Sequence, residues 1–260
     1  MNDALYIAAT GMQAQQKSVD TIANNLANVN TPGFKRAKVS FEDLVYRGLQ
    51  AAPASPGGVQ GAALWQGSGV GIASLAKVFA AGEIRKTEQP LDLAIDGVGF
   101  VEVTASDGSA AFSRGGSLAI DRDGMLVSAE GYPLKPGIHV GVDASELTIR
   151  PDGRVLVRAP GQSEAGEVGR IDLVRFADTD GLVSLGGNLY RPSEKSGDAI
   201  HGKAGEDGMG RLAQGSVEAS NVRLIDEMVG LMAAQRAYES SVKVIQAADE
   251  MLAMSNNLRK

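Results

Sequence analysis

Three short motifs contain residue types that could bind a phosphate, bind calcium or act as a nucleophile, and none of the three is complete. The run Gly67–Gly71 could wrap a phosphate, but it lacks the lysine of a P-loop and the spaced acid of a dinucleotide site. The run Asp121–Gly124 opens like a calcium loop without its third oxygen ligand and closing glutamate. We interpret the first as a turn before a strand and the second as a hairpin turn.

Nucleophilic catalysis has little support either. The run Gly115–Ala119 resembles a nucleophile elbow in which alanine replaces the closing glycine. Only His139, within an alternating run, and His201, within a glycine-rich stretch, could act as a general base. Aspartate and glutamate are scattered along the chain, so paired carboxylates stay open, but no pair stands out. We therefore predict no catalytic residue and no enzymatic activity.

Composition excludes several other classes of site. The 260 residues include no cysteine and two histidines, which excludes disulfides, thiolate metal sites and a histidine-rich metal site, so we expect no metal and no cofactor. A formal net charge of -6 without a basic stripe argues against nucleic-acid binding. We expect no transmembrane segment, because no run of 18 apolar residues exists, and no cleaved signal peptide, because the first residues lack a basic region and a long apolar core.

The strongest pattern lies near the start of the chain, where apolar residues alternate at spacings of three and four. This spacing is typical of a coiled-coil seam and predicts a helix that Pro32 and Gly33 terminate. The predicted N-terminal seam consists of Leu5, Ala8, Met12, Gln15, Val19, Ile22, Leu26 and Val29.

The end of the chain shows the same alternation. Asn221 is a plausible N-cap, and Asp226 and Glu227 stand in the first turn, where the helix dipole favours acids. Further apolar residues such as Val229 and Met232 widen this surface, so the helix should contact more than one neighbour. The predicted C-terminal seam consists of Leu224, Met228, Leu231, Gln235, Tyr238, Val242, Ile245, Asp249 and Leu252.

Between the helices, short alternating runs separated by Gly and Asp predict antiparallel hairpins. We expect an α+β fold with long N- and C-terminal helices that form a coiled-coil-like domain, a central antiparallel all-β domain and an extended arm. The Ala-, Gly- and Pro-rich stretch 49–71, with Trp65 as its large aromatic residue, is the arm, and 201–210 is a second flexible stretch. The expected domains are 1–33 with 216–260 (terminal helices), 34–81 (arm and linker) and 82–215 (β domain).

The residues alone leave three kinds of function open. Two amphipathic helices could complete a monomeric binding module that is secreted and recognises a glycan or a protein, or the β domain could carry an enzymatic carboxylate site. The third reading is self-assembly through the helices. The polar seam residues Gln15 and Gln235 favour it, because a buried polar group lowers stability but fixes register, which matters where many copies must fit identically.

Several long motifs in a fixed order resemble the family of flagellar rod and hook proteins, over most of the chain except about 49–66. The run FEDLVY and the length favour distal rod members over proximal rod paralogues and the longer hook proteins, which remain the alternatives. The motifs are ATGMQAQQ (9–16), IANNLANVNTPGFKR (22–36), FEDLVY (41–46), LDLAIDGVGFVEV (91–103), AFSRGGSLAIDRDGMLVSAEGYPL (111–134), GNLY (187–190) and the stretch 214–252.

This resemblance implies a structural subunit that polymerises helically into a hollow rod. The terminal helices would line the inner tube around the export channel, and the β domain would form the outer shell. The rod would carry torque to the hook from within the basal body, between periplasm and outer membrane. The implied partners are other copies of the chain, proximal rod proteins, the hook protein, cell-wall and outer-membrane ring proteins, and the type III export apparatus, which exports subunits without a cleaved signal.

The resemblance also gives the amide-rich N-terminal helix an explanation. Asn24, Asn25 and Asn28 could bridge subunits or line the pore without imposing a strong field on passing chains. We therefore expect the assembly interface to comprise the apolar and glutamine residues of both seams together with these three asparagines, and we expect Trp65 to mark the arm.

Overall fold

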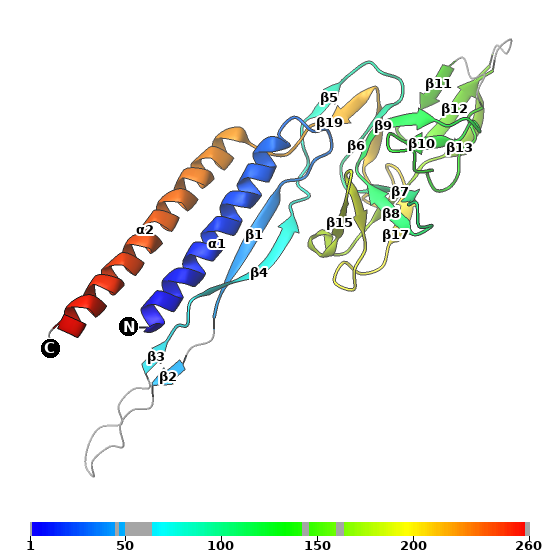
Figure 1. Cartoon of the computed structure of the whole chain (residues 1–260). Helices are drawn as coiled ribbons and strands as arrows, with labels where there is room; N and C mark the ends of the chain where they lie inside the picture. Colours follow the sequence, from blue (N-terminus) through cyan, green and yellow to red (C-terminus); the bar gives the residue numbers. More distant parts are fainter. Residues whose placement is uncertain (1, 45–46, 50–63, 142–145, 160–163, 258–260) are drawn as a thin grey trace. The chain divides into compact units, whose positions relative to one another are not determined.

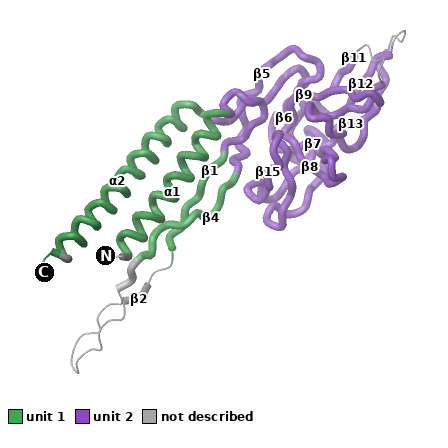
Figure 2. The backbone as a smooth tube through the Cα atoms, viewed as in Figure 1, with its two compact units in different colours: residues 1–27, 37–76, 223–260 green, residues 28–36, 77–222 purple. Residues whose placement is uncertain are grey.

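The computed structural model describes residues 2–44, 47–49, 64–141, 146–159 and 164–257, and the chain divides into two compact units (Figure 2). The helical unit contains 1–27, 37–76 and 223–260, and the β unit contains 28–36 and 77–222. The helices and the antiparallel sheets confirm an α+β fold. The expected linker does not form a separate body, because most of it belongs to the helical unit.

The helical unit is built on two long helices, α1 (Asn2–Ala27) and α2 (Leu224–Asn257). They lie side by side and run in opposite directions (Figure 1). Strand β1 (Ala37–Asp43) lies against α1 and pairs with β4 (Val70–Lys77), while β2 (Arg47–Leu49) pairs with β3 (Leu64–Gln66). The expected arm therefore includes paired strands. Residues 50–63 lie outside the described part of the chain, and Trp65 lies in β3.

Small residues stand at several contacts between the helices, and one of them, Gly230, meets Ile22 of the predicted N-terminal seam. A Cβ placed on Gly11 would lie 3.5 Å from Ser241 Oγ, and one on Gly230 would lie 3.4 Å from Ile22 Cδ1. Among the α2 residues whose burial the structure describes, the buried ones are Glu227, Ala234 and Ala248, which are separated by multiples of seven residues. These three positions share a seven-residue spacing but do not coincide with the predicted seam, because small side chains allow the closest approach of two helix backbones.

The β unit consists of antiparallel sheets. A six-stranded sheet has the order β15-β16-β8-β7-β14-β17, a four-stranded sheet β10-β9-β6-β18, a three-stranded sheet β11-β12-β13 and a two-stranded sheet β19-β5. Their bounds are β5 (Ile84–Lys86), β6 (Asp92–Asp96), β7 (Phe100–Thr104), β8 (Ala110–Ser113), β9 (Gly115–Ile120), β10 (Leu126–Ser128), β11 (Glu146–Ile149), β12 (Arg154–Arg158), β13 (Gly166–Arg170), β14 (Asp172–Arg175), β15 (Val183–Gly186), β16 (Leu189–Arg191), β17 (Ile200–Lys203), β18 (Arg211–Gln214) and β19 (Ser216–Glu218); a 3₁₀ turn, η1 (Thr179–Gly181), precedes β15.

Three hairpins expected from the sequence are present: β7 with β8, β9 with β10, and β11 with β12. The calcium-like run is the turn between β9 and β10, where Gly124 N donates to Asp121 O at 2.9 Å and Gly124 has a φ of +74°. The prediction of a flexible stretch at 201–210 is wrong at its start, because His201 lies in β17 and pairs with Val174 of β14.

Two hydrophobic clusters form the core of the β unit. The larger one is aliphatic and includes Leu93, Ile95 and Leu173. The smaller one is aromatic: Phe112 and Phe176 meet edge to face with ring centroids 4.9 Å apart, and Tyr190 packs in the same cluster. Burial raises the pKa of Tyr190 to about 12. Each fully buried apolar side chain of these two clusters contributes about 1.5–3 kcal/mol, so the β unit has a core of its own.

Candidate functional site

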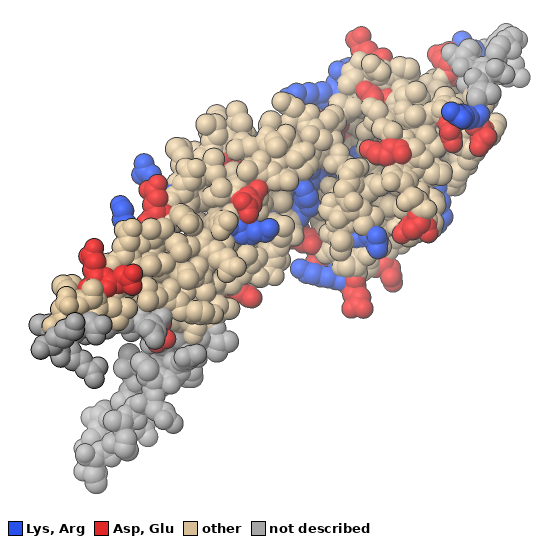
Figure 3. All heavy atoms as spheres, viewed as in Figure 1, with Lys and Arg blue, Asp and Glu red and all other residues tan. Residues whose placement is uncertain are grey.

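The first turns of α2 carry large apolar side chains that remain exposed. Ile225 is 75% exposed and Met232 is 54% exposed. Figure 3 shows wide uncharged areas over the helices between scattered acidic and basic groups. Soluble monomers rarely expose contiguous apolar patches of this kind, which mark interaction surfaces. We call this surface the α2 face; it consists of Leu224, Ile225, Met228, Val229 and Met232.

The predicted assembly residues divide into three groups by exposure. Ala8 is buried, as is Asn25. The exposed ones are Asn24, Leu224, Met228, Gln235 and Tyr238, and the half-buried ones are Leu5, Met12, Gln15, Val19, Ile22, Leu26, Asn28, Val29, Leu231, Val242, Ile245 and Leu252. The exposure of Gln235 removes it as a buried polar residue between the two helices. For Trp65 the structure describes only the backbone, in β3, and not the side chain.

Asn25, which the resemblance places between copies or along the pore, is buried within the single chain. It is 1% exposed, and its amide donates to Glu227 Oε2 at 3.1 Å and to Ala37 O at 2.9 Å, while its oxygen accepts from Ala37 N at 2.8 Å. Glu227 is itself buried on α2, at 6% exposure. The amide of Asn25 is therefore committed to bonds within the chain, and it connects α1 to both β1 and α2.

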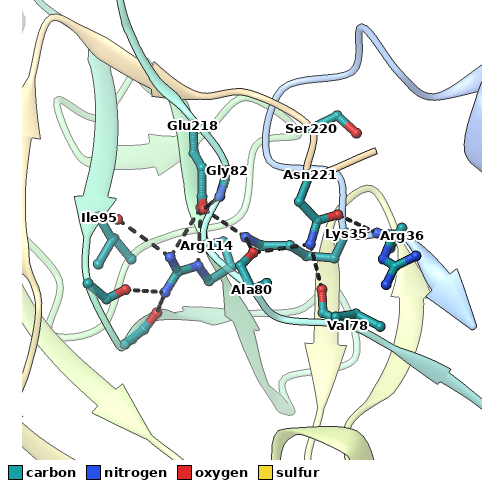
Figure 4. Close-up of polar contacts among 12 residues, drawn as sticks. Lys35, Arg36, Val78, Ala80, Gly82, Ile95, Arg114, Glu218, Ser220 and Asn221 are labelled. Carbon is teal, nitrogen blue, oxygen red and sulfur yellow. Dashed lines mark hydrogen bonds and ion pairs between the residues drawn. The ribbon is translucent and has the colours of Figure 1, made fainter. Parts of the chain in front are cut away.

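The β unit contains a buried ionic cluster of Lys35, Glu218 and Arg114 (Figure 4). The three residues are 0%, 3% and 4% exposed. Lys35 Nζ lies 2.7 Å from Glu218 Oε1, and Arg114 donates from Nε and Nη2 to Glu218 Oε2 at 3.2 Å each. One carboxylate thus pairs with two cations that are shielded from water and balances one of their two positive charges, so its removal would leave both cations without a counter-charge in the cluster.

Backbone carbonyls supply the remaining acceptors for these cations. Arg114 donates to the carbonyls of Gly97 at 3.0 Å and Gly99 at 2.6 Å, and Lys35 donates to Ala80 O at 2.8 Å. Burial lowers the pKa of Lys35 below its ordinary value, and its hydrogen bond to Glu218 opposes that shift.

The backbone of Gly82 also binds the carboxylate of Glu218, because Gly82 N donates to it at 2.7 Å. A Cβ at Gly82 would collide with the carbonyl of Ala219, so this approach requires glycine.

Asn221 connects the network to two further chain segments, one that contains Arg36 and one that contains Val78 and Ala80. Its side chain accepts from Arg36 N at 2.7 Å and donates to Val78 O at 2.7 Å and to Ala80 O at 3.1 Å (Figure 4). It is not the N-cap of α2, which begins three residues later at Leu224. The network joins the segments around Lys35, Val78 and Glu218, and the chain continues from these segments into β1, β4 and α2 of the helical unit.

These contacts show what the site can do chemically. The cluster is a structural connector, since its charged groups are buried and bonded to one another or to backbone. No cluster of His, Cys, Asp and Glu that could hold a metal ion occurs among the described residues. No local sequence pattern points to Lys35, Arg114 and Glu218, because an ion pair between distant segments leaves no such pattern.

Three family models match separate parts of the chain. "Flagella basal body rod protein" matches residues 5–35, "Flagellar hook protein FlgE/F/G D1 domain" matches 94–157, and "Flagellar basal body rod FlgEFG protein C-terminal" matches 213–258. The first and last of these matches cover nearly all of α1 and α2 with the chain that joins them to the β unit. The buried cluster draws one residue from each of the three matched regions: Lys35, Arg114 and Glu218.

Full-length relatives decide the family. The flagellar basal-body rod protein FlgG of Borreliella burgdorferi is 42% identical over 264 residues, covering 100% of both chains. The chain belongs to the flagellar rod and hook protein family. In Caulobacter vibrioides, FlgG is 39% identical over 98% of this chain and 99% of its own, whereas FlgF is 34% identical over 96% and 95%.

This rod protein is a structural subunit of the distal rod of the bacterial flagellum, and its place is the flagellar basal body. Membership of the family means that the subunit assembles into the rod and contacts other flagellar components. None of the described helices is both long enough and apolar enough to cross a membrane.

Proposed function

We propose that this subunit polymerises helically into a hollow drive shaft, in which the helical units of neighbouring copies pack on one another around the export channel. The observation that supports this proposal is the α2 face. Ile225, Met228 and Met232 expose apolar surface on a helix whose other side already packs on α1. Burial of that surface in the polymer would contribute about 1.5–3 kcal/mol for each fully covered side chain.

In this proposal the β unit forms the outer shell and the rod transmits torque to the hook. The specific partners are the proximal rod proteins, the hook protein, the rings of the cell wall and outer membrane, and the type III export apparatus. The subunit has its place between periplasm and outer membrane and performs no catalysis. The self-contained core of the β unit and the buried connections at Glu218 and Asn221 are compatible with a load-bearing part.

Removal of α2 should abolish polymerisation. We expect the purified chain to form filaments above a critical concentration, with preformed rod fragments as seeds, and a chain ending at Arg223 to remain monomeric because the α2 face is gone. Sedimentation and electron microscopy measure assembly, and circular dichroism verifies that the β unit keeps its strands. Equal polymerisation of the truncated chain, or a full chain that stays monomeric at every concentration with seeds present, would refute the proposal.

A further inference from the structure

The contact between α1 and α2 follows one antiparallel register, and several of the residues that meet in it are small. Gly11 meets Ser241, Ile22 meets Gly230 and Asn25 meets Glu227. Gly11 and Asn25 are fourteen residues apart, and so are their partners on α2, so both ends of the contact follow one antiparallel alignment. Gly11, Gly230 and Ser241 are small residues, and small side chains fix the register of a helix pair less strongly than large interlocking ones do.

A slip of seven residues would leave the stripe of small residues in this contact almost unchanged, although it would also move Ile22 from Gly230 to Ala237 or to Arg223, before the start of α2. The α2 positions at intervals of seven are Glu227, Ala234, Ser241 and Ala248, and those of α1 are Ala4, Gly11, Ser18 and Asn25. After a slip, alanine or serine therefore replaces alanine or serine almost everywhere. The exception is the pair of Asn25 and Glu227, because a slip would place each of these two polar groups opposite a small residue or beyond the partner helix.

We propose that Asn25 and Glu227 form a register lock that selects one alignment of the two terminal helices. Asn25 suits this role because it is held from a second side: Ala37, the first residue of β1, both donates to its oxygen and accepts from its nitrogen. The lock therefore fixes α2 against α1 and against the start of β1 together. A buried polar group that loses its partner carries a full desolvation cost, so the lock discriminates strongly between registers.

The lock positions the α2 face, and this part of the inference rests on the proposed function. A slip of seven residues would displace Met232 along α1 by about 10 Å at 1.5 Å per residue. A polymer needs every copy to present its apolar surface at the same place. Asn25 and Glu227 are thus positioning residues for assembly: they act through the alignment of the helices and need not contact another copy.

The absence of cysteine from the sequence allows a direct test of register. The pair Gly11→Cys with Ser241→Cys reports the native alignment, and Gly11→Cys with Ala248→Cys reports a slip of seven residues. In dilute monomer under mild oxidation, we expect the native pair to form its disulfide far faster than the slipped pair. In the background of Asn25→Ala with Glu227→Ala, the ratio of the two rates should fall roughly tenfold, the effect of losing one charge-assisted hydrogen bond.

Two further variants separate the lock from general destabilisation. Glu227→Gln keeps an oxygen that accepts from Asn25 and should preserve the native ratio, and Gln16→Ala on the exposed side of α1 should not change it. Circular dichroism verifies helix content in each variant. An unchanged ratio in the double alanine variant would overturn the lock.

Assembly is scored separately from register. A double alanine variant that loses its register yet polymerises normally would overturn the link to assembly. Because the disulfide ratio is measured on monomers, it remains decisive even if the wild-type chain never polymerises. Failure of the lock and failure of the proposed function therefore give different results.

Discussion

Replacement of Glu218 by alanine should lower the free energy of unfolding by about 3–5 kcal/mol, the usual cost of breaking a buried ion pair. Lys35 and Arg114 would both stay buried without the carboxylate that pairs with them. The loss is a large part of the roughly 5–15 kcal/mol that stabilises a typical domain. Urea denaturation, followed by the circular dichroism of the β unit, measures it.

An exposed ion pair provides the matched control. Glu83 pairs with Arg85 at 3.4 Å, and both side chains are largely exposed. Glu83→Ala should change stability by about 0–1 kcal/mol, since solvent screens such pairs. Adding Lys35→Met to Glu218→Ala should recover part of the loss, because one uncompensated cation disappears. Similar small losses for Glu218→Ala and Glu83→Ala would show that the buried cluster is not a structural connector.

Two negative charges on the α2 face should raise the critical concentration for polymerisation at least about a hundredfold. Burying one unpaired carboxylate costs several kcal/mol, and every 1.4 kcal/mol is a factor of ten in affinity. The variant is Met228→Glu with Met232→Glu. Both positions are exposed in the single chain, so the stability of the monomer should change little. Pelleting of polymer over a range of protein concentrations measures the effect.

The same two positions supply the control for shape and size. Met228→Leu with Met232→Leu keeps an apolar surface of similar volume and should polymerise near the wild-type concentration. If the glutamate variant assembles at that concentration as well, the α2 face is not part of the contact between copies.

The sequence predicted the elements well where the signal was local. Pro32 and Gly33 follow the end of α1 closely, and Gly124 stands at the turn between β9 and β10. Alternating hydrophobicity located the strands of three hairpins. The stretch around His201 was misjudged because its glycines suggested flexibility, although its backbone pairs with β14.

The buried stripe between the helices was misplaced for a physical reason. Hydrophobic periodicity gives most weight to large residues such as Met228, whereas the helix contact uses Ala234 and Gly230 because small side chains allow close approach. The large apolar residues of the first turns of α2 consequently remain outside. Their exposure is the feature that the proposed assembly requires.

The polar connections could not be read from local patterns. Glu218 lies 183 residues from Lys35 and 104 from Arg114, so only the completed fold brings them together. Asn221 was interpreted as a helix cap from its type and position, but its amide bonds to the chain before β1 and after β4. Asn25 stands out in the sequence as one of several clustered amides, but its bonds inside the chain depend on the distant Glu227.

The most direct test of the central claim, that other copies cover the α2 face, is thiol labelling at Val229. Val229→Cys introduces the only cysteine of the chain, at an exposed position of α2. We expect rapid labelling in dilute monomer and at least roughly tenfold slower labelling in polymer, with the Met228→Glu, Met232→Glu background as the unpolymerised control at equal concentration. Equal labelling rates in monomer and polymer would contradict the claim.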